Sequence, residues 1–365
     1  MHNLITKKII TGRVKMKTTI TLLFTFLMYF GTTTITFSQD AEKPECFFKS
    51  SSLHYTAGGM EYWYAKSQGG LETITGVPYN DLGCKNCHTA SCDVCHRAEK
   101  DGKFIYSNEA AKNQDMCLKC HAREASIMKI NQKANTPDVH FAAGMECMDC
   151  HTPREMHGDG TKYISMKQQG AMDVNCEQCH DKITKITSHT IHGNNLDCKA
   201  CHVNKVVSCT NCHFETMVKE GKRVAIPVSG WEFLMNYNNK VTSANMQTFV
   251  AAGNKTFMIF APQFSHSVSK KGKKCEECHN NANAQEIKKG TINLTWLDNN
   301  EVKQIYGVIP VVEGVQYNTV YQNFENGNWT PIADPQQPKV QYVGFGTPLM
   351  KAQLDKLLIT QKSKN

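Results

Sequence analysis

The sequence predicts a mainly α-helical protein with extensive loops. A five-residue pattern, C-x-x-C-H, occurs eight times in 365 residues, and little chain is left between most of its copies. Such short spacings favour short helices joined by loops over long regular elements. Strand-like sequence is confined to a small insertion at 224–264 and to the C-terminal region. The repeat in this chain is therefore the motif itself and not a longer solenoid unit.

Each C-x-x-C-H pattern is typical of covalent haem c attachment. Two thiols at this spacing can add to the two vinyl groups of one haem, and the following histidine then becomes the proximal ligand of the iron. The sequence thus predicts eight covalently bound haem c groups. The predicted attachment cysteines are Cys84, Cys87, Cys92, Cys95, Cys117, Cys120, Cys147, Cys150, Cys176, Cys179, Cys198, Cys201, Cys209, Cys212, Cys275 and Cys278. The predicted proximal ligands are His88, His96, His121, His151, His180, His202, His213 and His279.

Zinc, a redox dithiol and structural disulfides are the alternatives to haem. Two C-x-x-C units can form a four-thiolate zinc site, but zinc does not require a histidine directly after each second cysteine. A thioredoxin-like pair would be a single motif beside a βαβ pattern. Disulfides need no fixed spacing repeated eight times. The histidine that follows all eight pairs favours haem.

The first 38 residues have the order of a cleavable export signal. Basic residues within the first seventeen positions precede an apolar run from Ile20 to Phe30, and a cleavage site is predicted after Ser38. Met16 is an alternative start. A membrane anchor needs roughly 20 apolar residues, which is more than this run supplies. The sequence therefore predicts an exported protein of the periplasm or the extracellular space, with peripheral or no membrane association.

The formal net charge of +8 says little about partners. Five basic residues belong to the predicted leader, and every haem would add two propionates, so the finished protein is expected to be neutral to acidic. Nucleic acid is therefore not an expected partner. The expected partners are redox proteins, either quinol-linked or other cytochromes. Whether the protein also binds a small inorganic substrate or forms a homo-oligomer stays open at this stage.

The motif positions divide the chain into five predicted segments. These are a signal peptide (1–38), a region with seven motifs (39–223), a haem-free α/β insertion (224–264), the eighth motif (265–282) and a haem-free β-rich segment ending in a helix (283–365). Within the last segment, Asp298-Asn299-Asn300 supplies turn residues for a predicted hairpin. Thr347-Pro348 is predicted to open the final helix.

Six histidines outside the motifs are candidates for the distal position of the irons. They are His54, His140, His157, His189, His192 and His266. Iron with two histidine ligands cannot bind a substrate and serves only electron transfer. Eight irons and six candidates leave two sites that take Met, Lys or a ligand from another chain, or remain open. An open or Lys-ligated site would be catalytic.

Cys46 is the seventeenth and only cysteine outside the motifs. It is a weak catalytic candidate as a thiol beside an active haem, and its alternative interpretation is a free or intermolecular thiol in a polar, Pro-bearing neighbourhood. Charged residues near the motifs, such as Arg123 and Arg154, would either steer an anion or simply be solvated.

Eight such motifs behind an export signal resemble the bacterial octahaem cytochromes c. This broad group includes hydroxylamine oxidoreductase, octahaem nitrite reductase and octahaem tetrathionate reductase. Gly144–His151, Glu155–Gly158 and Cys209–His213 carry the resemblance. It implies a haem-packed, α-rich multihaem cytochrome fold and electron transfer outside the cytoplasm. Octahaem nitrite reductases have a Lys in place of the histidine in their catalytic motif, and all eight motifs here end in His. Tetrathionate reductase relatives use a Lys-ligated haem beside a cysteine, a role in which Cys46 is the only match.

Two functions follow from the sequence. The first is an exported octahaem cytochrome that transfers electrons along stacked, mostly bis-His haems. The second is a multihaem reductase or oxidase of nitrite, hydroxylamine or tetrathionate at one open or Lys-ligated haem. The shortage of distal ligands separates the two, and whether the protein is an enzyme stays open.

Overall fold

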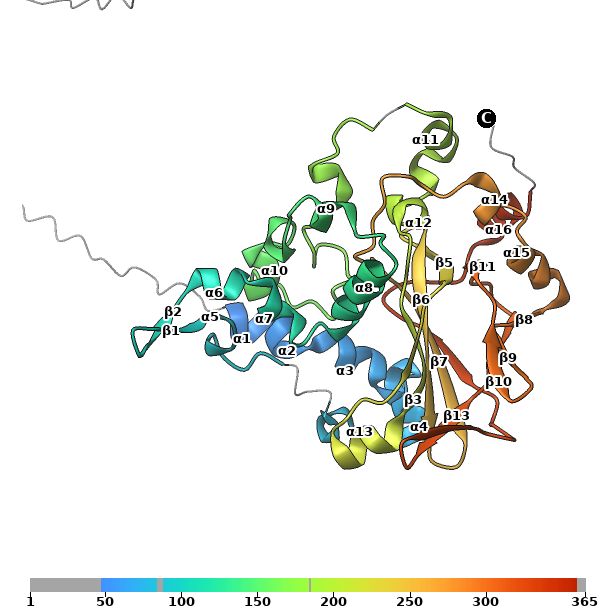
Figure 1. The fold of residues 1–365 in the computed structure, drawn as a ribbon, viewed down its shortest axis with the longest axis horizontal. Helices are drawn as coiled ribbons and strands as arrows, with labels where there is room; N and C mark the ends of the chain where they lie inside the picture. The colour runs from blue at the N-terminus through green and yellow to red at the C-terminus, as the bar shows by residue number, and fades with distance from the viewer. Residues whose placement is uncertain (1–46, 84–87, 184, 360–365) are drawn as a thin grey trace, which may run out of the picture. The chain divides into compact units, whose positions relative to one another are not determined.

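A mixed seven-stranded β-sheet and a large set of short helices build this protein (Figure 1). The structure, a computed structural model, describes residues 47–83, 88–183 and 185–359. The predicted signal peptide and Cys46 lie outside the described residues, as do Cys84 and Cys87. Helices account for 35% of the described residues and strands for 25%. The prediction of a mainly α-helical fold is therefore wrong.

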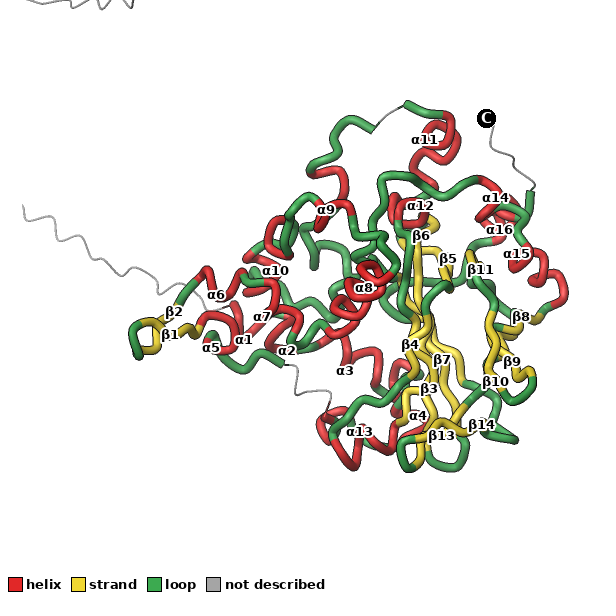
Figure 2. The backbone as a smooth tube through the Cα atoms, in the orientation of Figure 1, coloured by secondary structure: helices red, strands yellow, loops and turns green. Residues whose placement is uncertain are grey.

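Short helices and loops occupy most of the chain before the sheet, as Figure 2 shows in red and green. Most of these helices are four to seven residues long, and α8 is the exception with twelve. The α-helices of this part are α1 (Phe47–Ser51), α2 (Leu53–Thr56), α3 (Gly58–Tyr64), α4 (Glu72–Thr75), α5 (Asp93–His96), α6 (Asn108–Lys112), α7 (Gln114–Leu118), α8 (Ala122–Lys133), α9 (Val139–Ala142), α10 (Pro153–His157), α11 (Thr187–His192), α12 (Cys198–His202) and α13 (Phe214–Glu220). Single 3₁₀ turns occur among them, including η4 (Cys147–Asp149) and η5 (Cys176–Gln178).

The sheet is centred on the long strand β6 (Lys240–Ala251). On one side β6 pairs antiparallel with β7 (Lys255–Pro262), and on the other side with β5 (Trp231–Tyr237) and, in parallel, with β3 (Ser208–His213). The sheet is completed by β4 (Ile226–Val228) beside β3, β11 (Gly307–Pro310) beside β5 and β15 (Lys339–Tyr342) beside β7. Strands from four separate parts of the chain thus meet in one sheet.

Both faces of this sheet are buried. Alternate residues of β5, namely Trp231, Phe233 and Met235, enter one apolar cluster with Met246 and Phe260. Residues of a strand two apart face the same side, so this alternation fits the sheet. On the opposite face Leu234 packs with Ala200 of α12 and with the C-terminal helix. The sheet extends beyond the small insertion predicted at 224–264, because β3, β11 and β15 pair with its strands, and this pairing is the physical reason for the correction.

Further small elements follow the eighth motif. The predicted hairpin is confirmed as β9 (Thr295–Asp298) and β10 (Glu301–Gln304), with Asn299 and Asn300 in the left-handed conformation that such a turn requires. The final helix α16 (Lys351–Leu357) begins after Met350 and not at Thr347. The remaining elements are β1 (Arg97–Lys100), β2 (Lys103–Tyr106), α14 (Cys275–Cys278), α15 (Ala282–Glu286), β8 (Thr291–Asn293), β12 (Gln316–Asn318), β13 (Gln322–Glu325) and β14 (Asn328–Pro331).

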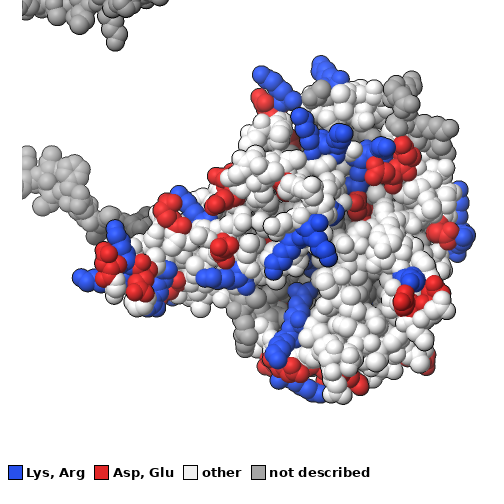
Figure 3. Space-filling view, in the orientation of Figure 1, with Lys and Arg blue, Asp and Glu red and all other residues white. Residues whose placement is uncertain are grey.

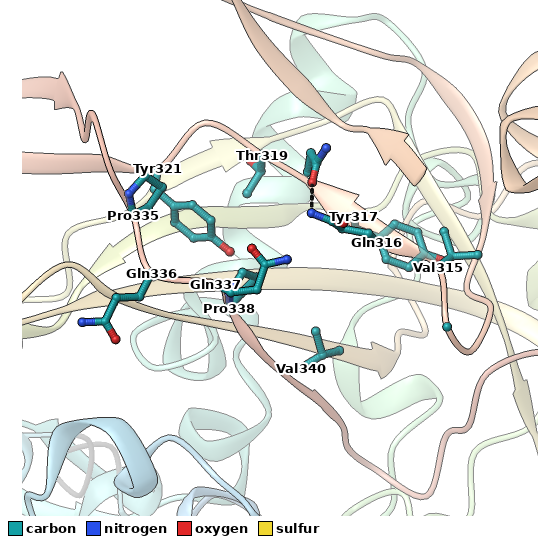
Figure 4. A pocket seen from close by; sticks show the side chains of 12 residues that line it. Val315, Gln316, Tyr317, Thr319, Tyr321, Pro335, Gln336, Gln337, Pro338 and Val340 are labelled. Carbon is teal, nitrogen blue, oxygen red and sulfur yellow. Dashed lines mark hydrogen bonds between the residues drawn. The ribbon is translucent and has the colours of Figure 1, made fainter. Parts of the chain in front are cut away.

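Three further observations bear on where a site can lie. No described helix has the length and apolar character needed to cross a membrane. On the face drawn in Figure 3, basic and acidic side chains form small separate groups. A pocket near β12 is lined by Tyr317, Tyr321 and the segment 335–338 (Figure 4), and none of the described residues lining it is His or Cys. The predicted ligands lie elsewhere.

Candidate functional site: six histidine pairs

Six of the seven motifs within the described residues adopt a helical turn. In five of them the histidine N–H donates to the carbonyl of the first cysteine, at distances from 2.7 to 3.1 Å, as His151 does to Cys147 at 3.0 Å. In the sixth, α12 spans the whole motif Cys198–His202. A helical turn places residues three and four apart on one face, so both thiols and the imidazole point to the same side. That is the arrangement that attachment of one haem requires.

Each of these six motif histidines faces one of the six candidate distal histidines. The pairs, with the distances between their ring centroids, are A, His96 and His157 at 5.9 Å; B, His54 and His121 at 6.2 Å; C, His151 and His266 at 6.3 Å; D, His140 and His180 at 6.2 Å; E, His189 and His202 at 6.2 Å; and F, His192 and His279 at 6.0 Å.

The separation within each pair fits an iron held between the two rings. A metal bound at about 2 Å by an imidazole nitrogen lies about 3 Å from the centre of that ring, so two rings on opposite sides of it are about 6 Å apart. All six pairs meet this distance, and each has a C-x-x-C in a helical turn beside it. The residues present therefore fit six bis-His haem c sites.

The pairs join distant parts of the chain. His54, on α2 near the start of the described residues, faces the third motif, and His266, just before the eighth motif, faces the fourth. Helix α2 is held in place by Ser52, whose hydroxyl donates to the carbonyl of Met156 on α10 at 2.6 Å. Helix α10 itself carries His157 of pair A. Closeness to a motif in the sequence identified the six candidate distal histidines. It did not predict which motif histidine each of them faces.

The motifs of neighbouring pairs lie next to one another in the order A to F. Burial and the nearby thiol of Cys117 raise the pKa of Cys95, which connects A with B. The thiols of Cys117 and Cys147 form a hydrogen bond, which lowers the pKa of Cys117 and connects B with C. Because such effects fall off with distance, they show that these motifs lie near one another.

The second half of this order rests on the same kind of contact. Burial raises the pKa of Cys150 and the neighbouring Cys179 raises it further, which connects C with D. A hydrogen bond between the thiols of Cys176 and Cys198 connects D with E. Burial raises the pKa of Cys278 to about 12, with Cys201 contributing in the same direction, which connects E with F. Each pair thus lies near the next in the order A to F, and this order is called the row.

The seventh motif, Cys209–His213, has a different backbone. It lies on strand β3, where the N–H of His213 donates to the carbonyl of Val224 at 2.9 Å and not to Cys209. Cys212 has no exposed surface and belongs to an apolar cluster with Phe249 and Phe257. Among the described residues no histidine faces His213, and burial lowers its pKa. This motif, as folded here, does not fit a haem c site.

The first motif is described only at His88. Its Nε2 lies 3.3 Å from the hydroxyl of Tyr79, and the two rings stack at 6.3 Å. No histidine faces it among the described residues. The shortage of two distal ligands predicted from the sequence thus falls on the first and the seventh motifs.

One functional neighbour was missed at the sequence level. Glu155 of α10 lies against His151, with Oε2 at 2.7 Å from Nδ1. Burial alone would raise the pKa of Glu155, but hydrogen bonds from His151 and from the N–H groups of Val174 and Asp173 lower it. The spacing of four residues between His151 and Glu155 was the available signal, since such residues are neighbours on a helical surface.

Comparisons with known proteins give one weak relationship. No family model matches the chain, and no solved structure gives a significant match. A stretch of 200 residues is 24% identical to the dissimilatory sulfite reductase MccA of Wolinella succinogenes, and it covers 45% of this chain and 26% of that protein. The chain thus spans about a quarter of the length of this curated relative. Together with the motifs, the similarity supports a relationship to multihaem cytochromes and does not single out the octahaem group.

Proposed function

We propose that this protein is an exported multihaem c-type cytochrome that transfers electrons along the row of pairs A to F. The observation that carries the proposal is the common separation of 5.9 to 6.3 Å within all six pairs. Haem c, when bound, supplies one-electron redox chemistry at its iron. The eight motifs of the sequence set the upper limit of the haem count. In six of them the motif histidine faces a second histidine at the distance that an iron between the two rings requires.

The residues of each pair would hold an iron from both sides. Two imidazoles leave no axial position for a substrate, so these six sites suit electron transfer and not catalysis. The paired cysteines would fix each porphyrin at its edge. The sulfur atoms of Cys117 and Cys147, and those of Cys176 and Cys198, lie close together, so the attachment points of these successive sites are adjacent. The ends of the row, pairs A and F, are the proposed places of exchange with redox partner proteins.

Export is part of this proposal. It is supported by the basic and apolar leader of residues 1–38, because haem c attachment takes place outside the cytoplasm. The periplasm or the extracellular space is the proposed location. The leader itself lies outside the described residues.

A second candidate function is the reduction of a small oxyanion at the first motif. Two observations favour it: His88 contacts Tyr79 where six of the other motifs have a histidine pair, and part of the chain is similar to a dissimilatory sulfite reductase. An iron held by His88 alone would keep one position for a substrate. Sulfite therefore joins nitrite, hydroxylamine and tetrathionate as a substrate to test.

Electron paramagnetic resonance of the ferric protein separates the two functions. Electron transfer alone predicts only low-spin signals that do not change on adding sulfite, nitrite, hydroxylamine or tetrathionate. A high-spin signal that one of these compounds alters would establish the reductase. Both functions would be refuted if this protein, produced in a host with intact cytochrome c assembly, contained zinc instead of haem.

A further inference from the structure

The histidines of the six pairs differ in what accepts a hydrogen bond from Nδ1. In pairs E and F the acceptors are neutral backbone carbonyls: Nδ1 of His202 lies 3.0 Å from the carbonyl of Ser269, and Nδ1 of His279 lies 2.9 Å from that of Lys356. In pair C the acceptor is a carboxylate, because Nδ1 of His151 lies 2.7 Å from Oε2 of Glu155. Hydrogen bonds to charged acceptors are roughly twice as strong as those between neutral groups.

Glu155 is fixed in this position. Its side chain has 0% exposed surface, and its second oxygen, Oε1, accepts hydrogen bonds from the backbone N–H groups of Asp173 at 2.5 Å and Val174 at 3.0 Å. Arg154 holds the loop that supplies these donors, with Nε 2.8 Å from the carboxylate of Asp173. The carboxylate therefore cannot turn to water, and Oε2 remains directed at His151.

The opposite side of pair C has no such contact. Nδ1 of His266 is buried and has no hydrogen-bond partner among the described residues. Other carboxylates near paired histidines are weaker acceptors. Glu124 lies 3.8 Å from Nδ1 of His121 in pair B, and Asp138 lies 3.3 Å from Nδ1 of His140 in pair D. Both oxygens of Asp138 already accept from backbone N–H groups, of His140 and of Val268.

We propose that Glu155 is a positioning residue that makes pair C the site of lowest reduction potential in the row. A carboxylate that accepts the Nδ1 proton fixes the tautomer of His151 and makes Nε2 a stronger electron donor. A stronger donor stabilises ferric iron over ferrous iron, which lowers the potential. The inference rests on the proposed function, in that pair C must hold a haem iron. Since pair C is third in the row of six, Glu155 sets a low-potential site between the two ends.

The test compares Glu155→Gln, Glu155→Asp and the control Glu124→Gln in the mature, full-length holoprotein. Gln keeps the size of the side chain and removes the charge, and Asp keeps the charge on a shorter side chain. Glu124 is the matched control for charge alone, because its carboxylate acts on His266 of pair C but lies too far from Nδ1 of His121 for a hydrogen bond. The readouts are haem content and a redox titration followed by electron paramagnetic resonance of the low-spin signals.

In Glu155→Gln we expect one component of the titration to move to higher potential while the haem content stays complete. Glu155→Asp should give a smaller shift in the same direction, and Glu124→Gln, which removes a charge but no hydrogen bond to a motif histidine, should shift the titration less than Glu155→Gln does. If Gln at position 155 impairs maturation, Glu155→Asp alone decides the question. A titration of either matured variant that superimposes on that of the unaltered protein overturns the inference.

Peptide mapping of the unaltered protein separates failure of this inference from failure of the proposed function. A peptide containing Cys147 and Cys150 without haem would refute the proposed function at pair C, and the inference with it. A peptide that carries haem, combined with an unshifted potential in Glu155→Gln, would refute only the role of Glu155.

Discussion

The sixth and seventh motifs share one sequence pattern and differ in backbone. Cys198–His202 forms helix α12, whose Ala200 packs on the sheet, and its histidine faces His189. Cys209–His213 begins a few residues later and runs as strand β3 within the sheet. No histidine of the described residues faces His213, and its second cysteine is fully buried.

The difference shows that the pattern alone does not determine a haem site. In a helical turn, residues three and four apart share one face, but in a strand residues three apart point to opposite faces. In β3 a register shift between the two cysteines changes this alternation, because Cys209 pairs with Gln247 and Cys212 with Phe249, which lie two apart and on one face of β6. Cys212 is buried among apolar side chains and Cys209 is half-buried. A bulge at Asn211, whose φ is 54°, is held by a hydrogen bond from its N–H to Oγ1 of Thr248 at 2.8 Å. The sheet thus holds the seventh motif as a bulged strand with Cys212 fully buried, and not as the helical turn that the other six motifs adopt.

The largest difference between the sixth and seventh motifs should appear when the two cysteines of each motif are replaced. We expect the double variant Cys198→Ala, Cys201→Ala to contain one haem fewer than the unaltered protein, because pair E loses its covalent attachment. The double variant Cys209→Ala, Cys212→Ala should keep the full haem content. Intact mass and the pyridine haemochrome assay measure both. Loss of a haem from the second variant would contradict the distinction drawn between α12 and β3.

A smaller effect is expected from the histidines. His189→Ala should leave the iron at His202 with an open position, so one low-spin signal should become high-spin and bind carbon monoxide. His213→Gln should leave every haem signal as it was. Electron paramagnetic resonance and absorbance difference spectra record the outcome. A signal altered by His213→Gln would show that this histidine is a ligand after all.

The smallest effect concerns the pH dependence of stability. Burial lowers the pKa of His213, so the folded chain resists a proton that the unfolded chain takes up. The contribution of His213 to the free energy of unfolding should therefore be fully present above the ordinary histidine pKa of about 6.5. It should be lost as the pH falls below that value. His213→Gln should flatten this dependence, as followed by chemical unfolding between neutral and mildly acidic pH. An unchanged slope would mean that His213 does not titrate, as expected of an iron ligand.

Several elements were predictable because their signals are local. The turn at Asp298–Asn300 was one, since asparagine tolerates the left-handed conformation that the hairpin needs. The fold class was not predicted correctly, because β3, β11 and β15 join the sheet by pairing with β6, β5 and β7, which are distant from them in sequence. Strand preference depends on such neighbours more than on the residues themselves.

The sequence by itself determined which atoms are available: the thiols, the motif histidines and the six further histidines that face them. Only the tertiary structure decided that His54 faces His121, that His266 faces His151 and that the seventh motif becomes a strand. The physical reason is that a five-residue pattern fixes chemistry but not backbone conformation. Hydrogen bonds and burial contributed by distant parts of the chain select between helix and strand.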